Sequence, residues 1–103
     1  MIRPMTMALC AGLMISIFPG DLHAGPISRA CLKADRPAAN ARLCRCIQAA
    51  ADRDLSRADQ RLAAGFFRDP HRAQEIRQSD RPSHERFWER YKRFGARAQA
   101  MCG

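Results

Sequence analysis

The chain has 103 residues, a formal net charge of +8 at pH 7 and 47% hydrophobic residues. A chain of this length forms one domain at most, and its core is too small to be stable without further support. It is also short for an enzyme that encloses its substrate, and its sequence contains no nucleophile elbow, Gly-rich phosphate loop or obvious acid–base pair, so we expect a non-enzymatic protein.

The first 24 residues have the three-part layout of a secretory signal peptide. Arg3 precedes an apolar run from Met5 to Phe18, and helix breakers and small residues then lead to Ala24. The run is shorter than the roughly 20 apolar residues of a membrane-spanning helix. We therefore predict a signal peptide over 1–24, cleaved after Ala24, and a single exported domain over 25–103 in the periplasm or outside the cell. No later stretch is apolar enough to span a membrane.

Residues 25–103 contain no Val or Thr, and Ala, Arg, Leu and Gln dominate, which favours helices over strands. In chain order we predict helices over about 27–34 and 38–54, a third from an N-cap at Ser56 to about Phe67, a short fourth from Pro70, and a fifth over about 82–102. Asp59 follows Ser56 as a capping-box partner, and Asp69 is placed to cap the fourth helix. The predicted fold is all-α: a small single-domain bundle of about five short helices joined by two disulfides.

The apolar residues recur at three- and four-residue steps, which predicts one buried face on each helix. The predicted core positions are Leu43, Ile47, Ala50, Ala51 and Leu55; Ala58, Leu62, Phe66 and Ala63 or Phe67; Ala73 and Ile76; and Phe87, Tyr91, Phe94, Ala98 and Met101.

Four cysteines remain after the predicted cleavage, and an even number in a short exported chain indicates two disulfides. Cys44 and Cys46 project about 200° apart on a helix, so they cannot bond to each other. Each needs its own partner, either Cys31 or Cys102. We slightly favour Cys31–Cys44 with Cys46–Cys102; the pairing 31–46 with 44–102 stays open.

A C-x-C pair can also act as a redox dithiol or bind copper or zinc. His71, His84 and Met101 are conceivable additional ligands for such a site. Neither histidine has ligand spacing relative to a cysteine, and both occur near predicted helix starts among polar residues. We favour structural disulfides and predict no metal and no cofactor; a thiol-redox or copper-handling role for Cys44 and Cys46 is the alternative.

The basic charge favours an anionic partner: lipid, lipopolysaccharide or an envelope protein. Arg86, Arg90, Arg93 and Arg97 form a row along the last helix, next to its aromatic face, and are the candidate anion-binding residues. Alternatively, these arginines only cover the edge of the core with their methylene stems, or reflect a genome that prefers Arg to Lys. Nucleic acid is a less favoured partner because no nucleic-acid-binding motif is present and export removes it from reach.

Five segments are distinctive: "LCRCIQ", "LSRADQR", "FFRDPH", "QEIRQSD" and "FWERYKRFG". With these segments the chain resembles a family of short exported proteins from alphaproteobacteria that are often labelled "arginine transporter". The resemblance covers essentially all of residues 25–103 and implies export, and its label implies an accessory role in amino-acid transport. Physical arguments disfavour that role, because a transporter needs spanning helices and a +8 surface repels arginine.

Overall fold

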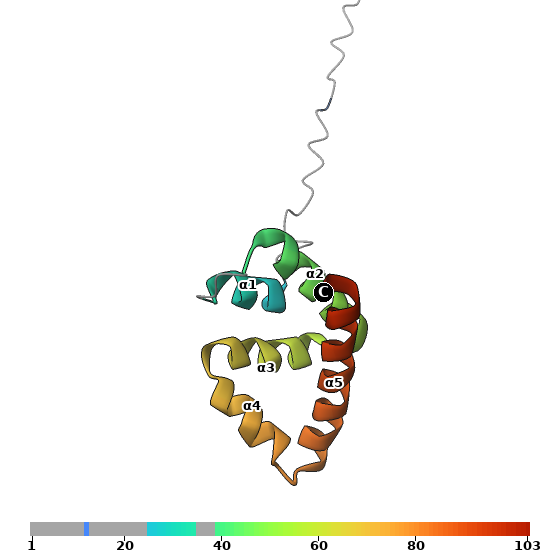
Figure 1. Cartoon of the computed structure of the whole chain (residues 1–103). Coiled ribbons are helices and arrows are strands. Elements are labelled where there is room, and N and C mark those ends of the chain that lie inside the picture. The colour runs from blue at the N-terminus through green and yellow to red at the C-terminus, as the bar shows by residue number, and fades with distance from the viewer. Residues whose placement is uncertain (1–11, 13–24, 35–38) are drawn as a thin grey trace, which may run out of the picture.

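Five α-helices follow one another in the computed structural model, which describes residues 12, 25–34 and 39–103 (Figure 1). The all-α prediction is confirmed. The predicted signal peptide and its cleavage site after Ala24 fall outside the described residues, apart from residue 12. The helices are α1 (Pro26–Lys33), α2 (Ala41–Asp54), α3 (Arg57–Arg68), α4 (Pro70–Arg77) and α5 (Pro82–Cys102). Among the described residues, no helix is long and apolar enough to cross a membrane.

Local sequence signals set the helix ends. Ser56 and Asp59 form the predicted capping box at the start of α3, with the Ser56 hydroxyl accepting the Asp59 N–H at 3.1 Å. Asn40 caps α2 by accepting the Leu43 N–H at 2.9 Å, which shortens the helix predicted from residue 38. Asp69 occupies the N-cap position of α4, but its side chain forms no capping hydrogen bond there.

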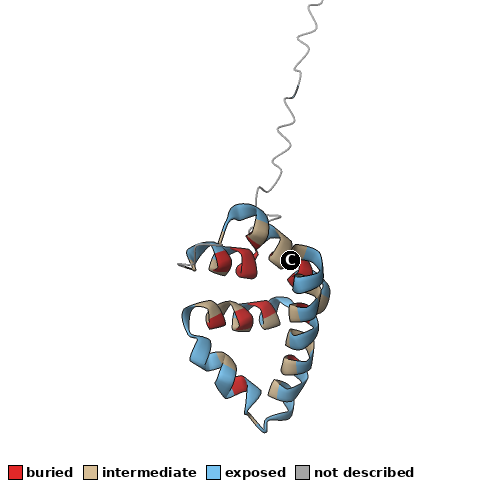
Figure 2. Cartoon of the chain, in the orientation of Figure 1, coloured by how far each residue is buried: buried red, intermediate tan, exposed pale blue. Residues whose placement is uncertain are grey.

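The helices are arranged around α2 and α5. In Figure 1, α5 runs along one side of the molecule, α1 and α3 lie beside each other, and α4 connects the end of α3 to the start of α5. α2 packs on both α1 and α5, and α3 packs on α1. Figure 2 shows buried residues on the neighbouring parts of α1 and α3, so these two helices share part of the core.

Aromatic residues of α3 and α5 form one part of the core. The Phe66 ring meets the rings of Phe87 and Tyr91 edge-on, with centroids 6.0 and 5.4 Å apart. Phe87, Tyr91 and Phe94 come from one face of α5, as the three- and four-residue spacing predicts. The Arg-bordered aromatic face of α5 therefore packs inside the protein.

Two predicted core positions are wrong. Ala58 is exposed, because Gln60 and Ala63 supply the buried side of α3 and place Ala58 on the solvent side. Met101 is 43% exposed, and it lines an open surface pocket with Leu43 and Cys46 of α2 instead of packing in the core.

A buried glutamine caps a helix other than its own. Gly25, the N-cap of α1, has no side chain to satisfy the backbone donors of the first turn. Gln48 of α2 supplies the missing acceptor: its Oε1 accepts the Ser28 N–H at 2.9 Å. A Cβ on Gly25 would collide with the end of the Gln48 side chain, so the close approach of this amide to the start of α1 depends on glycine at this position.

The same amide extends the network to α3. Gln48 Nε2 donates to Gln60 Oε1 at 2.7 Å and to Asp52 Oδ1 at 2.8 Å. Gln60 Nε2 in turn donates to the Leu55 carbonyl at 3.2 Å and to Asp52 at 3.1 Å. In the described part of the chain, no buried side-chain nitrogen or oxygen lacks a hydrogen-bond partner. This satisfied network fixes α1, α2 and α3 relative to one another.

Two disulfides join α2 to its neighbours. Cys31 of α1 is bonded to Cys44, and Cys46 is bonded to Cys102 at the end of α5, with Cα atoms 5.6 and 5.8 Å apart. This is the pairing that the sequence slightly favoured. Cys44 and Cys46 point to different neighbouring helices, as their helical positions require.

Candidate anion-binding site

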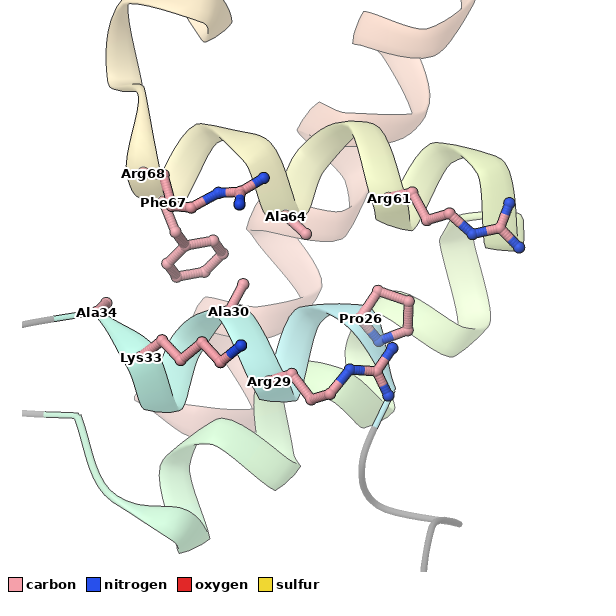
Figure 3. Close-up of a pocket in the computed structure, with 9 residues that line it drawn as sticks. All are labelled: Pro26, Arg29, Ala30, Lys33, Ala34, Arg61, Ala64, Phe67 and Arg68. Atoms are coloured by element: carbon pink, nitrogen blue, oxygen red, sulfur yellow. The ribbon is translucent and has the colours of Figure 1, made fainter.

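A groove of about 540 Å³ lies between α1 and α3 (Figure 3). We call it the basic groove. Its apolar lining comes from Pro26, Ala30 and Ala34 of α1 and from Ala64 and Phe67 of α3. Alanine at these positions keeps the side chains short between the two helices, which leaves the space open.

Basic side chains border the groove from both helices. Arg29 and Lys33 are four residues apart in α1, and Arg61 and Arg68 are seven residues apart in α3, so each pair lies on one helix face. In Figure 3, Arg29 and Arg61 lie toward the Pro26 end, while Lys33 and Arg68 lie toward the Phe67 end.

The residues that line the groove include no Asp or Glu. Among the described residues, Lys33, Arg61 and Arg68 form no ion pair, and all three are exposed. Bringing several cations together costs Coulomb energy that a bound anion removes. The groove is therefore electrostatically suited to a negatively charged ligand with an apolar part.

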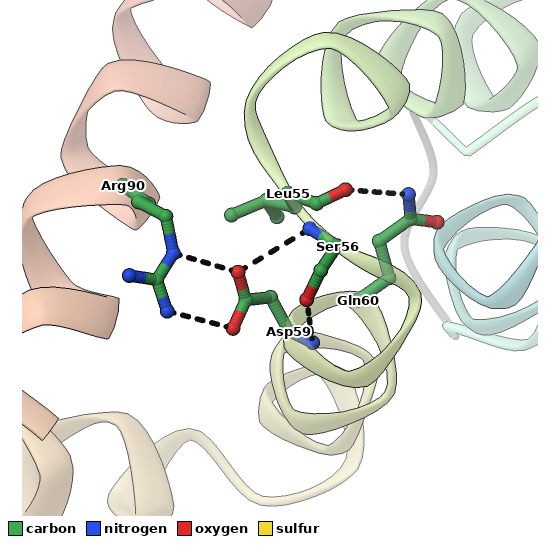
Figure 4. Close-up of polar contacts among 5 residues, drawn as sticks. All are labelled: Leu55, Ser56, Asp59, Gln60 and Arg90. Carbon is green, nitrogen blue, oxygen red and sulfur yellow. Dashed lines mark hydrogen bonds and ion pairs between the residues drawn. The ribbon is translucent and has the colours of Figure 1, made fainter. Parts of the chain in front are cut away.

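The predicted arginine row on α5 is divided between two environments. Arg90 forms a two-pronged ion pair with Asp59 of α3, at 2.7 Å from Nε and 3.0 Å from Nη2 (Figure 4). This contact holds the pKa of Asp59 below its ordinary value and raises the pKa of Arg90. Asp59 also accepts the Ser56 N–H at 3.3 Å, so one carboxylate both closes the capping box and attaches α3 to α5.

Arg97 of α5 forms a second ion pair of the same kind, with α2 instead of α3. Its Nε donates to Asp54 at the end of α2 at 2.7 Å, and Nη2 donates at 3.3 Å. The hydrogen bonds from Arg97, with a smaller Coulomb contribution from Arg93, lower the pKa of Asp54. Arg90 and Arg97 therefore attach α5 to α3 and α2.

The other two members of the row have different surroundings. Arg86 and Arg93 are exposed, and neither forms an ion pair with a described residue. Anion binding by the row stays a prediction, and only these two arginines have guanidinium groups available for it.

The conceivable metal ligands are dispersed in the structure. Cys44 and Cys46 are each in a separate disulfide. His84 Nδ1 lies 2.7 Å from the Ser79 hydroxyl, and His71 Nε2 lies 3.7 Å from a Glu75 oxygen. Within residues 25–34 and 39–103, no three His, Cys, Asp or Glu side chains gather in a way that could hold a metal ion.

Comparison of the chain with protein-family models, curated proteins and solved structures gives no match. The resemblance to short exported alphaproteobacterial proteins therefore stays a prediction.

Sequence reasoning did not find the basic groove. The signal in α1 was local: Arg29 and Lys33 alternate with Ala30 and Ala34 at helical spacing. The second half of the groove comes from basic and apolar residues of α3. Their position beside α1 depends on which helices pack together, and the spacing within one helix does not determine this.

Proposed function

We propose that this protein is an exported, non-enzymatic helical protein that binds an anionic component of the cell envelope through the basic groove. The observation that carries the proposal is a basic rim around an apolar lining that includes no carboxylate, in which Lys33, Arg61 and Arg68 form no ion pair with a described residue. The signal-peptide pattern and the two disulfides support a location outside the reducing cytoplasm.

The size of the expected effect follows from general membrane electrostatics. A Lys or Arg near an anionic bilayer contributes about 1 kcal/mol to binding, and this attraction decreases as salt screens the charges. Arg86 and Arg93 on α5 add to the basic surface without lining the groove. Binding is therefore expected to be charge-driven and strongest where the groove cations meet the anion.

Vesicle co-sedimentation tests the proposal. The oxidised, exported protein is mixed with vesicles of phosphatidylglycerol and phosphatidylcholine, or of phosphatidylcholine alone, over about 50 to 500 mM salt. We expect binding to the anionic vesicles only, weakening as salt rises. Lys33→Glu with Arg68→Glu should weaken binding more than the matched reversal of two exposed arginines elsewhere, Arg45→Glu with Arg77→Glu. Equal binding to both vesicle types, or equal effects of the two reversals, would contradict the proposal.

The alternatives have weaker support. A thiol-redox or copper-handling role needs Cys44 and Cys46 to act together, whereas each sulfur is bonded to a different helix. A role in arginine transport is disfavoured because the groove cations repel a cationic amino acid.

A further inference from the structure

We propose that the ligand of the basic groove is a single-chain anionic amphiphile, bound as a monomer with its alkyl chain along the apolar lining and its acidic head among the cations. The inference rests on the proposed function and names the chemistry of its ligand.

The lining gives the first reason. Between the cations of the two rims lie Pro26, three alanines and the half-buried Phe67, with hydrocarbon side chains only. A purely ionic ligand such as inorganic phosphate would use the rim and leave this surface in contact with water. A ligand with a hydrocarbon part covers it and gains free energy for each methylene removed from water.

The volume of the groove gives the second reason. An α-helix with its side chains is about 10 Å wide, so one turn occupies about 420 Å³. The groove measures about 540 Å³ and therefore has room for little more than one turn of a partner helix. A single alkyl chain needs much less volume than a helix turn and can lie between α1 and α3, whereas a partner helix of several turns would extend beyond the groove.

The position of the cations gives the third reason. Lys33 from α1 and Arg68 from α3 approach the Phe67 end of the groove from opposite sides (Figure 3). A phosphate or carboxylate head between them can accept hydrogen bonds from both, and Arg can bind two oxygens at once. The head is thus held between these two cations, and the chain lies along the alanines between α1 and α3.

Titration calorimetry with decyl phosphate below its micelle concentration tests the inference on the intact, oxidised protein. We expect binding that tightens about fourfold for each added methylene in an alkyl phosphate series. The gain should stop once the chain fills the groove. Inorganic phosphate and an uncharged decyl maltoside should bind at least tenfold more weakly than decyl phosphate.

Matched variants show whether the binding occurs in the groove. Ala30→Phe fills the groove without changing the charge and should weaken decyl phosphate binding at least tenfold, whereas Ala49→Phe, at an exposed position of α2, should leave it unchanged. The double variant Lys33→Gln with Arg68→Gln should also weaken decyl phosphate binding about tenfold. The control double variant, Arg45→Gln with Arg77→Gln, should bind decyl phosphate like the wild type. Circular dichroism and the unfolding midpoint of each variant identify any loss of fold.

The outcomes separate this inference from the proposed function. Binding of anionic vesicles without binding of decyl phosphate overturns the inference and leaves the proposed function standing. If neither anionic vesicles nor decyl phosphate binds at low salt, the inference and the proposed function are both overturned. The inference is also overturned if Ala30→Phe does not weaken decyl phosphate binding. It is likewise overturned if a Glu-rich helical peptide binds in the groove and decyl phosphate does not.

Discussion

The side-chain amide of Gln48 in α2 donates a 2.7 Å hydrogen bond to the side-chain oxygen Oε1 of Gln60 in α3, and both residues are buried. The oxygen of the same Gln48 amide accepts the backbone N–H of Ser28 in the first turn of α1. One side chain thus connects three helices, and it holds α1 beside α3, where the two helices form the basic groove. The orientation of α1, and with it the shape of the groove, depends on a buried polar contact as well as on a disulfide.

Replacing Gln48 by Leu should destabilise the protein by about 2 kcal/mol, because the buried Ser28 N–H and Gln60 oxygen lose their partner. Urea unfolding followed by far-UV circular dichroism measures the change. Gln74→Leu, at an exposed position of α4, is the control and should have little effect. A Gln48→Leu variant as stable as the wild type would show that the network does not fix α1.

Gly25→Ala should be destabilising although the backbone angles of Gly25 suit any residue. The added Cβ would collide with the Gln48 amide and displace it from its hydrogen bonds, at a cost of about 1–3 kcal/mol. The effect should shrink when Gln48 is already Ala, because the collision is then removed. A double-mutant cycle measures this coupling, and additive effects of the two substitutions would contradict the proposed contact.

The two disulfides should differ in their contribution and in their reactivity. The chain-entropy relation gives about 4 kcal/mol for a bridge spanning 56 residues (Cys46–Cys102) and about 3 kcal/mol for one spanning 13 (Cys31–Cys44). Cys46 and Cys102 are partly exposed, whereas Cys31 and Cys44 are buried. Under mild reductant, alkylation and mass mapping should therefore label Cys46 and Cys102 first. Labelling of Cys31 and Cys44 first would contradict this order.

The ion pairs of α5 make stability depend on acid pH. Arg90 and Arg97 lower the pKa values of Asp59 and Asp54 in the folded protein. Because an unfolded Asp has a pKa of about 3.9, this stabilisation is complete above about pH 5 and is lost as the pH falls toward the folded values.

Asp54→Asn with Asp59→Asn should therefore lower the unfolding midpoint at neutral pH and flatten its decline below about pH 5. Asp80→Asn, at an exposed carboxyl that forms no ion pair with a described residue, is the control. A decline with acid that is as steep in the double variant as in the wild type would assign the pH dependence to other groups.

Helical spacing predicted much of this fold, because it depends on properties of one helix at a time. The opposite directions of Cys44 and Cys46 required separate partners, and the steps from Phe87 to Phe94 identified the buried face of α5. The prediction that Ala58 is buried was wrong, because a small apolar residue fits the solvent side of a helix as readily as the core. Gln48 and Gln60 are missing from the predicted core because the spacing rule counts apolar residues only. Both glutamines nevertheless lie on the same helix face as buried neighbours.

The candidate anion-binding surface was harder to predict, because it depends on which helices pack together. Arg90 and Arg97 looked like surface charges until the fold placed Asp59 and Asp54 opposite them. Lys33 and Arg68 are far apart in sequence and line one groove only because α1 packs on α3.

Binding of an anionic lipid in the basic groove is tested most directly by mapping, from amide chemical-shift changes, which residues of the isotope-labelled, oxidised protein respond to anionic lipid nanodiscs. We expect the largest changes in α1 and α3 around Lys33, Ala64 and Arg68, and we expect them to disappear in zwitterionic nanodiscs. Changes concentrated around Arg86 and Arg93 of α5, or the same changes with zwitterionic lipid, would contradict this expectation.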